Sequence, residues 1–282
     1  MSRWTGTLLA AAASLLAIIP AAHAGIFGPT GSRTPPMLAV KLDKPVAPAL
    51  VATLDKASQS GLAVKTTPTP VYLSAIDGAD LGTGGKVGVL YMGGDFCPYC
   101  AGQRWGLMLT LLRFGRFSGL HYMLSSDTDV YPSTPTVTFQ HATYTSKYVD
   151  FQAVELSDRD GKQLMQPDAL QKKIFLKFDA PPYTRYAQGI PFVYVDGHYM
   201  LSAPIVLPSQ IHGLNWQQIA NALGSPNSPL AQAVMPRVNL LTAAICQRLG
   251  AKGPAKVCKA PGVKAAAAKL PAVAGSLSAG NR

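Results

Sequence analysis

Two apolar runs open the patterned part of the chain. Residues 71–76 and 87–92 are mostly apolar, and the glycine-rich turn 82–85 separates them. A short continuous apolar run is typical of a buried strand. We therefore predict two strands, the second of which lies in the centre of a sheet.

A helical period begins after the second run. Pro98 suits the first position of a helix, because its φ angle is fixed and its missing N–H is not needed there. Apolar side chains then recur, mainly at spacings of three and four, at Trp105, Met108, Leu109, Leu112 and Phe117. This spacing predicts an amphipathic helix that begins at Pro98 and includes this segment.

The rest of the chain alternates strand patterns with helix patterns. We predict strands at 120–124, 136–139 and 148–156, a helix at 166–178, a hairpin at 190–201 around Asp196-Gly197, and helices at 208–223 and 229–249. A strand, a helix, further strands and a late hairpin with flanking helices indicate an α/β layer architecture.

The N-terminus has the three parts of a secretory signal. Residues 1–24 contain the basic Arg3, an apolar run over 8–19 and the small-x-small site Ala22-His23-Ala24. The run is shorter than the about 20 residues that cross a bilayer. We expect cleavage after Ala24 and a periplasmic or extracellular protein; an uncleaved membrane anchor is the alternative.

Composition divides the mature chain into three parts. Residues 25–70 are rich in proline, threonine, alanine and glycine, with one helical stretch at 48–60, and predict a loosely packed extension. Residues 71–259 hold the strand and helix patterns of one domain. Residues 260–282 are rich in alanine and lysine and predict a disordered basic tail.

The net charge of +11 is concentrated at the two ends. Arg3 belongs to the signal, and six further basic residues follow position 250: Lys252, Lys256, Lys259, Lys264, Lys269 and Arg282. The body without them carries only about +4, which argues against a nucleic-acid groove. We expect no nucleic-acid partner.

Four cysteines form two pairs by spacing. Cys97 and Cys100 are three apart at the predicted start of a helix, where free amides and the helix dipole stabilise a thiolate. We expect Cys97 to be the exposed nucleophile and Cys100 the buried thiol that resolves a mixed disulfide. No cofactor is required for this chemistry.

Metal binding is the competing interpretation of this pair. A zinc site needs two further ligands, and neither the other cysteines nor the scattered histidines supply them at suitable spacing. Copper needs fewer ligands, so a copper-binding or metallochaperone protein stays an alternative. A redox-inert interaction module with a structural bridge is the third possibility.

The sequence around the first pair resembles the domain-of-unknown-function family 929, a thioredoxin-like group. The resemblance is carried by residues 91–101, Arg104-Trp105, 113–115, Phe117-Ser118, Ser125-Ser126, 129–132 and 241–246. It implies a thioredoxin-like fold with extra strands, an N-terminal extension and additional C-terminal helices. By analogy it implies thiol–disulfide exchange with protein thiols or disulfides, together with an unidentified recycling partner.

The thioredoxin fold also implies roles for residues near the pair. It places a cis-proline opposite the redox cysteines, and Pro191, which precedes the predicted hairpin, occupies that position. The backbone of Ile190 would then pair with an extended substrate. We take Cys97, Cys100 and Pro191 as catalytic candidates. The substrate-binding candidates are Ile190, Pro98 and Tyr99.

Three side chains close to the pair are given structural roles. We expect Asp95 to be a turn or cap residue that points to water; the alternative is a carboxylate that raises the thiol pKa. Arg104 lies about two helical turns from Cys97, too far for direct contact with its thiolate. Trp105 is expected in the core.

Cys246 and Cys258 lie late in a predicted helix and after a Gly-Pro turn. A bond between them would close a short loop and stabilise the fold by about 3 kcal/mol in the entropic model. We predict a structural disulfide; a second redox relay is the alternative.

Overall fold

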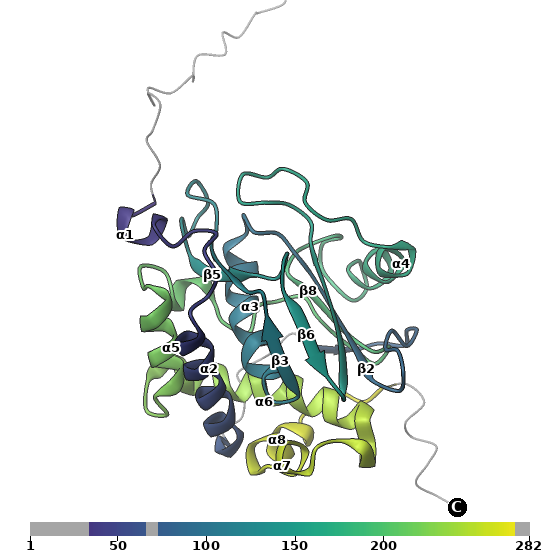
Figure 1. The fold of residues 1–282 in the computed structure, drawn as a ribbon. Coiled ribbons are helices and arrows are strands. Elements are labelled where there is room, and N and C mark those ends of the chain that lie inside the picture. The colour runs from purple at the N-terminus through teal and green to yellow at the C-terminus, as the bar shows by residue number, and fades with distance from the viewer. Residues whose placement is uncertain (1–33, 66–72, 274–282) are drawn as a thin grey trace, which may run out of the picture. The chain divides into compact units, whose positions relative to one another are not determined.

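The computed structural model of the chain describes residues 34–65 and 73–273 (Figure 1). The signal peptide predicted at 1–24 lies outside the described residues. The elements are α1 (Pro36–Ala39), α2 (Pro48–Ser60), η1 (Gly61–Ala63), β1 (Leu73–Ala75), β2 (Val87–Gly93), α3 (Pro98–Leu111), β3 (Gly115–Ser118), β4 (His121–Leu124), β5 (Pro135–Thr138), β6 (Thr143–Ser146), β7 (Val149–Glu155), α4 (Ala169–Phe178), β8 (Phe192–Val195), β9 (Tyr199–Leu201), η2 (Pro208–Gln210), α5 (Trp216–Gly224), α6 (Pro229–Leu249), η3 (Gly250–Lys252), α7 (Ala255–Cys258) and α8 (Pro261–Ala267).

A mixed sheet with strand order β1-β9-β8-β2-β7 forms the centre of the fold. Strand β2 runs parallel to β7, in a register that pairs Val87 with Val149 and Gly93 with Glu155. On its other side β2 runs antiparallel to β8, with Met92 opposite Phe192. The α/β fold class predicted from the sequence is therefore confirmed.

Both faces of the central strand are buried, which explains its unbroken apolar sequence. Leu90 and Met92 belong to a cluster that includes the buried face of α4. Val89 and Tyr91 belong to a larger cluster shared with α3, α6, α2 and α5. Since successive side chains of a strand point to opposite faces, the sheet is sandwiched between α4 and the remaining helices (Figure 1).

The N-terminal extension differs from the prediction of loose packing. Its helix α2 has the predicted bounds, but it lies against α5 and buries Leu50, Leu54 and Ala57. Apolar residues at this helical spacing form one stripe, and burial of the stripe holds the helix on the domain. In Figure 1, α2 and α5 run beside each other.

The prediction of a disordered tail from 260 is wrong for residues 260–273. Residues 261–267 form α8, which contacts α6 and η1 and buries Val263 and Ala266. The high alanine and lysine content indicated disorder, although the segment has one apolar face when it is helical. Residues 274–282 of the predicted tail lie outside the described residues.

Two predicted helices have different limits. Helix α3 ends at Leu111, and Phe117 belongs to β3, where its ring stacks on Phe139 at 5.5 Å. The strand pair β3–β6 was not predicted. The helix expected at 208–223 is divided into η2 and α5, because Asn215 caps α5 through a capping box.

Candidate active site

Cys97 occupies the N-cap position of α3, directly after the turn that follows β2. Its Sγ atom accepts a hydrogen bond from the backbone N–H of Cys100 at 3.2 Å. Pro98 is the first helical residue, as predicted. A side chain at an N-cap faces the free amides and the positive end of the helix dipole, so the sequence places the sulfur where negative charge is stabilised.

The two thiols have opposite electrostatic environments. The expectation of an exposed Cys97 is wrong: Cys97 is buried, with 6% of its surface exposed, and Cys100 is fully buried as expected. Hydrogen bonding from Cys100 lowers the pKa of Cys97 below its ordinary value against the effect of burial, and the Arg104 cation contributes. Burial raises the pKa of Cys100 well above its ordinary value. This asymmetry is the one expected of an attacking and a resolving thiol.

The predicted cis-proline is confirmed in position and geometry. The Ile190–Pro191 peptide bond is cis, and the Sγ of Cys97 lies 3.9 Å from the carbonyl oxygen of Ile190. The backbone of Ile190 therefore lies beside the first cysteine. A second cis bond, Pro181–Pro182, was not predicted from the sequence.

A row of aromatic rings extends outward from the cysteine pair. Tyr99 is 40% exposed, and its ring meets the ring of Tyr131 edge-on with centroids 6.2 Å apart. Tyr131 in turn meets His212 at 5.8 Å. Of these three rings, only Tyr99 was a candidate from the sequence, because Tyr131 and His212 come from loops far along the chain. We call Tyr99, Tyr131 and His212 the aromatic row.

The expectation that Asp95 is a turn or cap residue in water is wrong. Asp95 is fully buried and does not point to water. Its Oδ1 lies 2.9 Å from Nη2 of Arg104, and its Oδ2 accepts a hydrogen bond from Thr138. Glu155 binds the same guanidinium through both carboxylate oxygens, at 2.9 and 2.6 Å. Two buried carboxyl groups thus share one cation behind the cysteine pair.

This arrangement perturbs Asp95 in a specific direction. Burial and the neighbouring Glu155 raise the pKa of Asp95 to about 7, although Arg104 and Thr138 act against them. The alternative expectation, that this carboxylate raises the thiol pKa, stays a prediction. Glu155 could have been suspected from the sequence, since it ends a strand parallel to the one before Cys97 and such ends meet at one sheet edge.

Other predictions for this region have clear outcomes. Trp105 is in the core, as expected, and donates its indole N–H to the carbonyl of Pro135. Within the described residues Arg104 forms no hydrogen bond with Cys97, and it lowers the pKa of Cys97 through its charge. Gly102 lets the loop that precedes η2 approach α3, because a Cβ there would lie 1.9 Å from the Val206 carbonyl oxygen.

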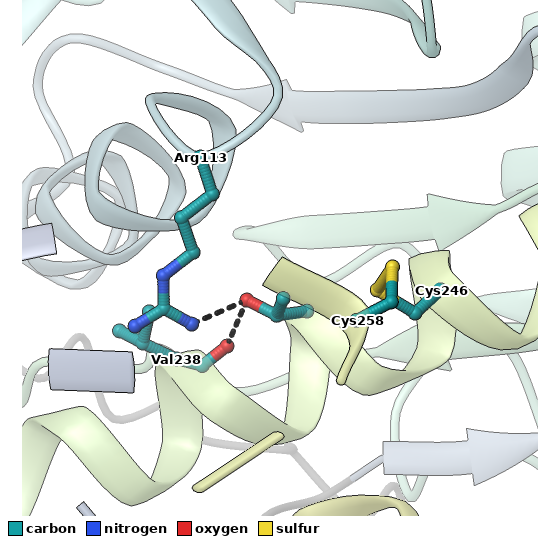
Figure 2. Close-up of a disulfide and its surroundings, with 5 residues drawn as sticks. Arg113, Val238, Cys246 and Cys258 are labelled. Atoms are coloured by element: carbon teal, nitrogen blue, oxygen red, sulfur yellow. Dashed lines mark hydrogen bonds between the residues drawn. A yellow bond between two sulfur atoms is a disulfide. The ribbon is translucent and has the colours of Figure 1, made fainter. Parts of the chain in front are cut away.

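Cys246 and Cys258 form a disulfide (Figure 2). Arg113, two residues beyond the last residue of α3, donates from Nη1 to the hydroxyl of Thr242, one turn before Cys246. Helix α3 has 14 residues and is thus about 20 Å long. Cys97 and the disulfide therefore lie toward opposite ends of α3, and the structure does not bring the two pairs together.

Within residues 34–65 and 73–273, no helix has the length and apolarity needed to cross a membrane. Over the same ranges, three or more metal-binding side chains do not gather at any point.

Residues 72–184 match the family described as "Domain of unknown function (DUF929)", which supports the assignment made from the sequence motifs. This segment contains the cysteine pair and Asp95, whereas Pro191 and the disulfide lie beyond it. No curated protein and no solved structure matches the chain.

Proposed function

We propose that the chain is an exported, thioredoxin-like thiol–disulfide oxidoreductase that acts on protein disulfides through Cys97 and Cys100. One observation carries the proposal: the Cys97 sulfur caps a helix and lies beside the carbonyl of Ile190, which precedes a cis-proline. The opposite pKa directions of the two thiols support it further.

The proposed reaction exchanges two electrons and two protons between the pair and a substrate. The Cys97 thiolate attacks one sulfur of a substrate disulfide, and the other substrate sulfur leaves as a thiolate and takes up a proton. Cys100 then loses its proton and attacks the Cys97 sulfur. The mixed disulfide breaks, the substrate leaves as a dithiol, and Cys97 and Cys100 are left joined. The reverse sequence oxidises a dithiol.

The thioredoxin-like part of the proposal is supported by the order of elements. Strand β2, helix α3, the parallel strand β7, helix α4 and the hairpin β8–β9 succeed one another before α6. The sheet places β2 between β7 and β8. Parallel neighbours joined through a helix, followed by an antiparallel hairpin, form the layered core that this chemistry uses in the thioredoxin fold.

The test measures exchange with a peptide disulfide by the full chain. Wild type is expected to exchange, Cys97→Ser to be inactive, and Cys100→Ser to accumulate a mixed disulfide that mass spectrometry detects at Cys97. The pair Cys246→Ser and Cys258→Ser serves as the control for nonspecific loss of cysteine. Unchanged exchange by Cys97→Ser would contradict the proposal.

Two further measurements separate the alternatives. Tight binding of Cu(I) without disulfide exchange would favour copper handling, and a pair that resists reducing agents in the folded protein would favour an inert bridge. For an active enzyme, a reduction potential near about −120 mV indicates an oxidant and one near about −270 mV a reductant.

A further inference from the structure

A buried carboxylate lies at the base of the loop that leads to Ile190. Asp179 follows the last residue of α4 and is only 1% exposed. Its Oδ2 atom accepts no hydrogen bond from the described residues that meets ordinary distance and angle limits. Burial without a strong partner is costly for a carboxylate, so its retention at this position calls for a role.

The position of Asp179 is fixed from the side of the helix. Its backbone N–H donates to the carbonyl of Phe175, and Phe175 and Phe178 pack against the aromatic residues of β8. Helix α4 and strand β8 thus form a rigid support. The carboxyl group is carried by this support and not by the loop.

The loop itself, residues 180–189, is largely exposed between its two ends. It closes on Asp179, because the N–H of Gln188 donates to the Asp179 carbonyl at 2.8 Å. The carboxyl group lies against Gly189, where a Cβ would be 3.9 Å from Oδ2. The next residue is Ile190, whose carbonyl faces Cys97.

We propose that Asp179 is a positioning residue: its main-chain carbonyl binds Gln188, its carboxyl group lies against Gly189, and together they fix the backbone of Ile190 beside Cys97. This inference rests on the proposed function, since the segment it holds is the one that would pair with an extended substrate. Asp179 does not touch the reacting sulfurs.

The raised pKa of this group agrees with the geometry. Burial raises the pKa of Asp179 to about 6, while the hydroxyl of Thr184 and the N–H of Gly189 lower it in part. Both of these groups belong to the loop. Their effect on the pKa agrees with the position of the carboxyl group against Gly189.

The experiment compares Asp179→Ala and Asp179→Asn with wild type in three measurements. The first is exchange with a peptide disulfide, which needs the Ile190 backbone; the second is alkylation of Cys97 by iodoacetamide, which does not. The third is the rate of trypsin cleavage after the exposed Arg185 in the loop. Asp77→Asn is the matched control, because this exposed aspartate lies beside α4 through the bond from Lys177 to its carbonyl.

For Asp179→Ala we expect about tenfold slower peptide exchange and about tenfold faster cleavage at Arg185, because the loop loses the carboxyl group against which Gly189 lies. Iodoacetamide alkylation should change less than twofold. Asp179→Asn keeps an acceptor oxygen and should restore most of the exchange rate. If Asp179 only stabilised the fold, its substitution would change peptide exchange and iodoacetamide alkylation to the same extent.

Two results would overturn the inference in distinguishable ways. If Asp179→Ala folds, is cleaved faster at Arg185 and still exchanges at the wild-type rate, Asp179 holds the loop without serving the site, and the proposed function stands. If wild type does not exchange with any peptide disulfide, the proposed function fails and the inference fails with it.

Discussion

Cys97 and Ile190 are separated by 93 positions in the chain, and in the fold the Sγ of one lies 3.9 Å from the carbonyl oxygen of the other. Cys97 follows the end of the central strand β2. Ile190 precedes the start of β8, the antiparallel neighbour of β2, so the two residues lie at the same edge of the sheet. A substrate backbone laid along Ile190 would therefore bring its own sulfur to Cys97.

Cys100 controls the acidity of Cys97. Hydrogen bonding from Cys100 is the largest cause of the lowered pKa at Cys97. Cys100→Ala removes the thiol but keeps the backbone N–H, so we expect the pKa of Cys97 to rise toward its ordinary value. The ultraviolet absorbance of the thiolate as a function of pH measures it. An unchanged titration curve would assign the effect to the helix amides alone.

Asp95 should shape the pH dependence of stability. Its pKa is raised from 3.8 to about 7, so between these values the folded protein holds a proton that the unfolded chain has released. The free energy of unfolding therefore falls as the pH rises through this window.

Asp95→Asn tests this linkage. The raised pKa of Asp179, about 6, covers only the lower part of the window, so the fall between about 6 and about 7 belongs to Asp95. We expect the substitution to flatten that upper part, measured as the melting temperature against pH. Asp77→Asn, at an exposed position, should leave the curve unaltered. The idea is rejected if wild type and Asp95→Asn have parallel curves.

The disulfide should contribute stability and not turnover. Cys246→Ser with Cys258→Ser opens a loop whose ends are 12 positions apart, and we expect a loss of about 3 kcal/mol in the free energy of unfolding. Urea denaturation measures the loss. Exchange by the folded variant should be unchanged, because the disulfide and Cys97 lie toward opposite ends of α3. Lost turnover in a folded variant would instead support the relay interpretation.

The aromatic row should bind the substrate. Tyr131→Ala removes the ring that joins Tyr99 to His212, and we expect about a fivefold higher KM for a protein disulfide, the effect of about 1 kcal/mol of lost aromatic contact. The kcat should be retained, since within the described residues no hydrogen bond joins Tyr131 to Cys97 or Cys100. Tyr131→Phe keeps the ring and is the control. A fall in kcat with unchanged KM would contradict this role.

The local signals in the sequence were sufficient for the elements that carry the cysteines. The apolar run 87–92 and the proline at 98 defined β2 and the start of α3, because burial on both faces and helix initiation leave strong patterns over few residues. The same holds for the hairpin around Asp196-Gly197. These elements predicted the α/β class, and the cis-proline followed from the thioredoxin-like fold that their order implies.

The interior electrostatics could not be predicted in the same way. Asp95 follows two glycines, which favours a turn that points to water. Its burial depends on a cation nine positions later and on Glu155 at the end of another strand. The aromatic row and the base of the Asp179 loop likewise depend on residues that meet only when the sheet and its loops are assembled.

The helix that caps the C-terminal part of the domain has a consequence for the order of folding. A Cβ at Gly262 would lie 2.3 Å from the carbonyl oxygen of Val64 and 2.5 Å from Nδ2 of Asn239. Helix α8 therefore packs closely against the segment that follows η1. About 200 residues of chain separate the two sides of this contact. During synthesis, the segment after η1 cannot make this contact until α8 has been synthesised. Contacts between residues so far apart in the sequence slow folding. In a protein truncated before α8, the segment at Val64 would stay exposed on the side that α8 contacts.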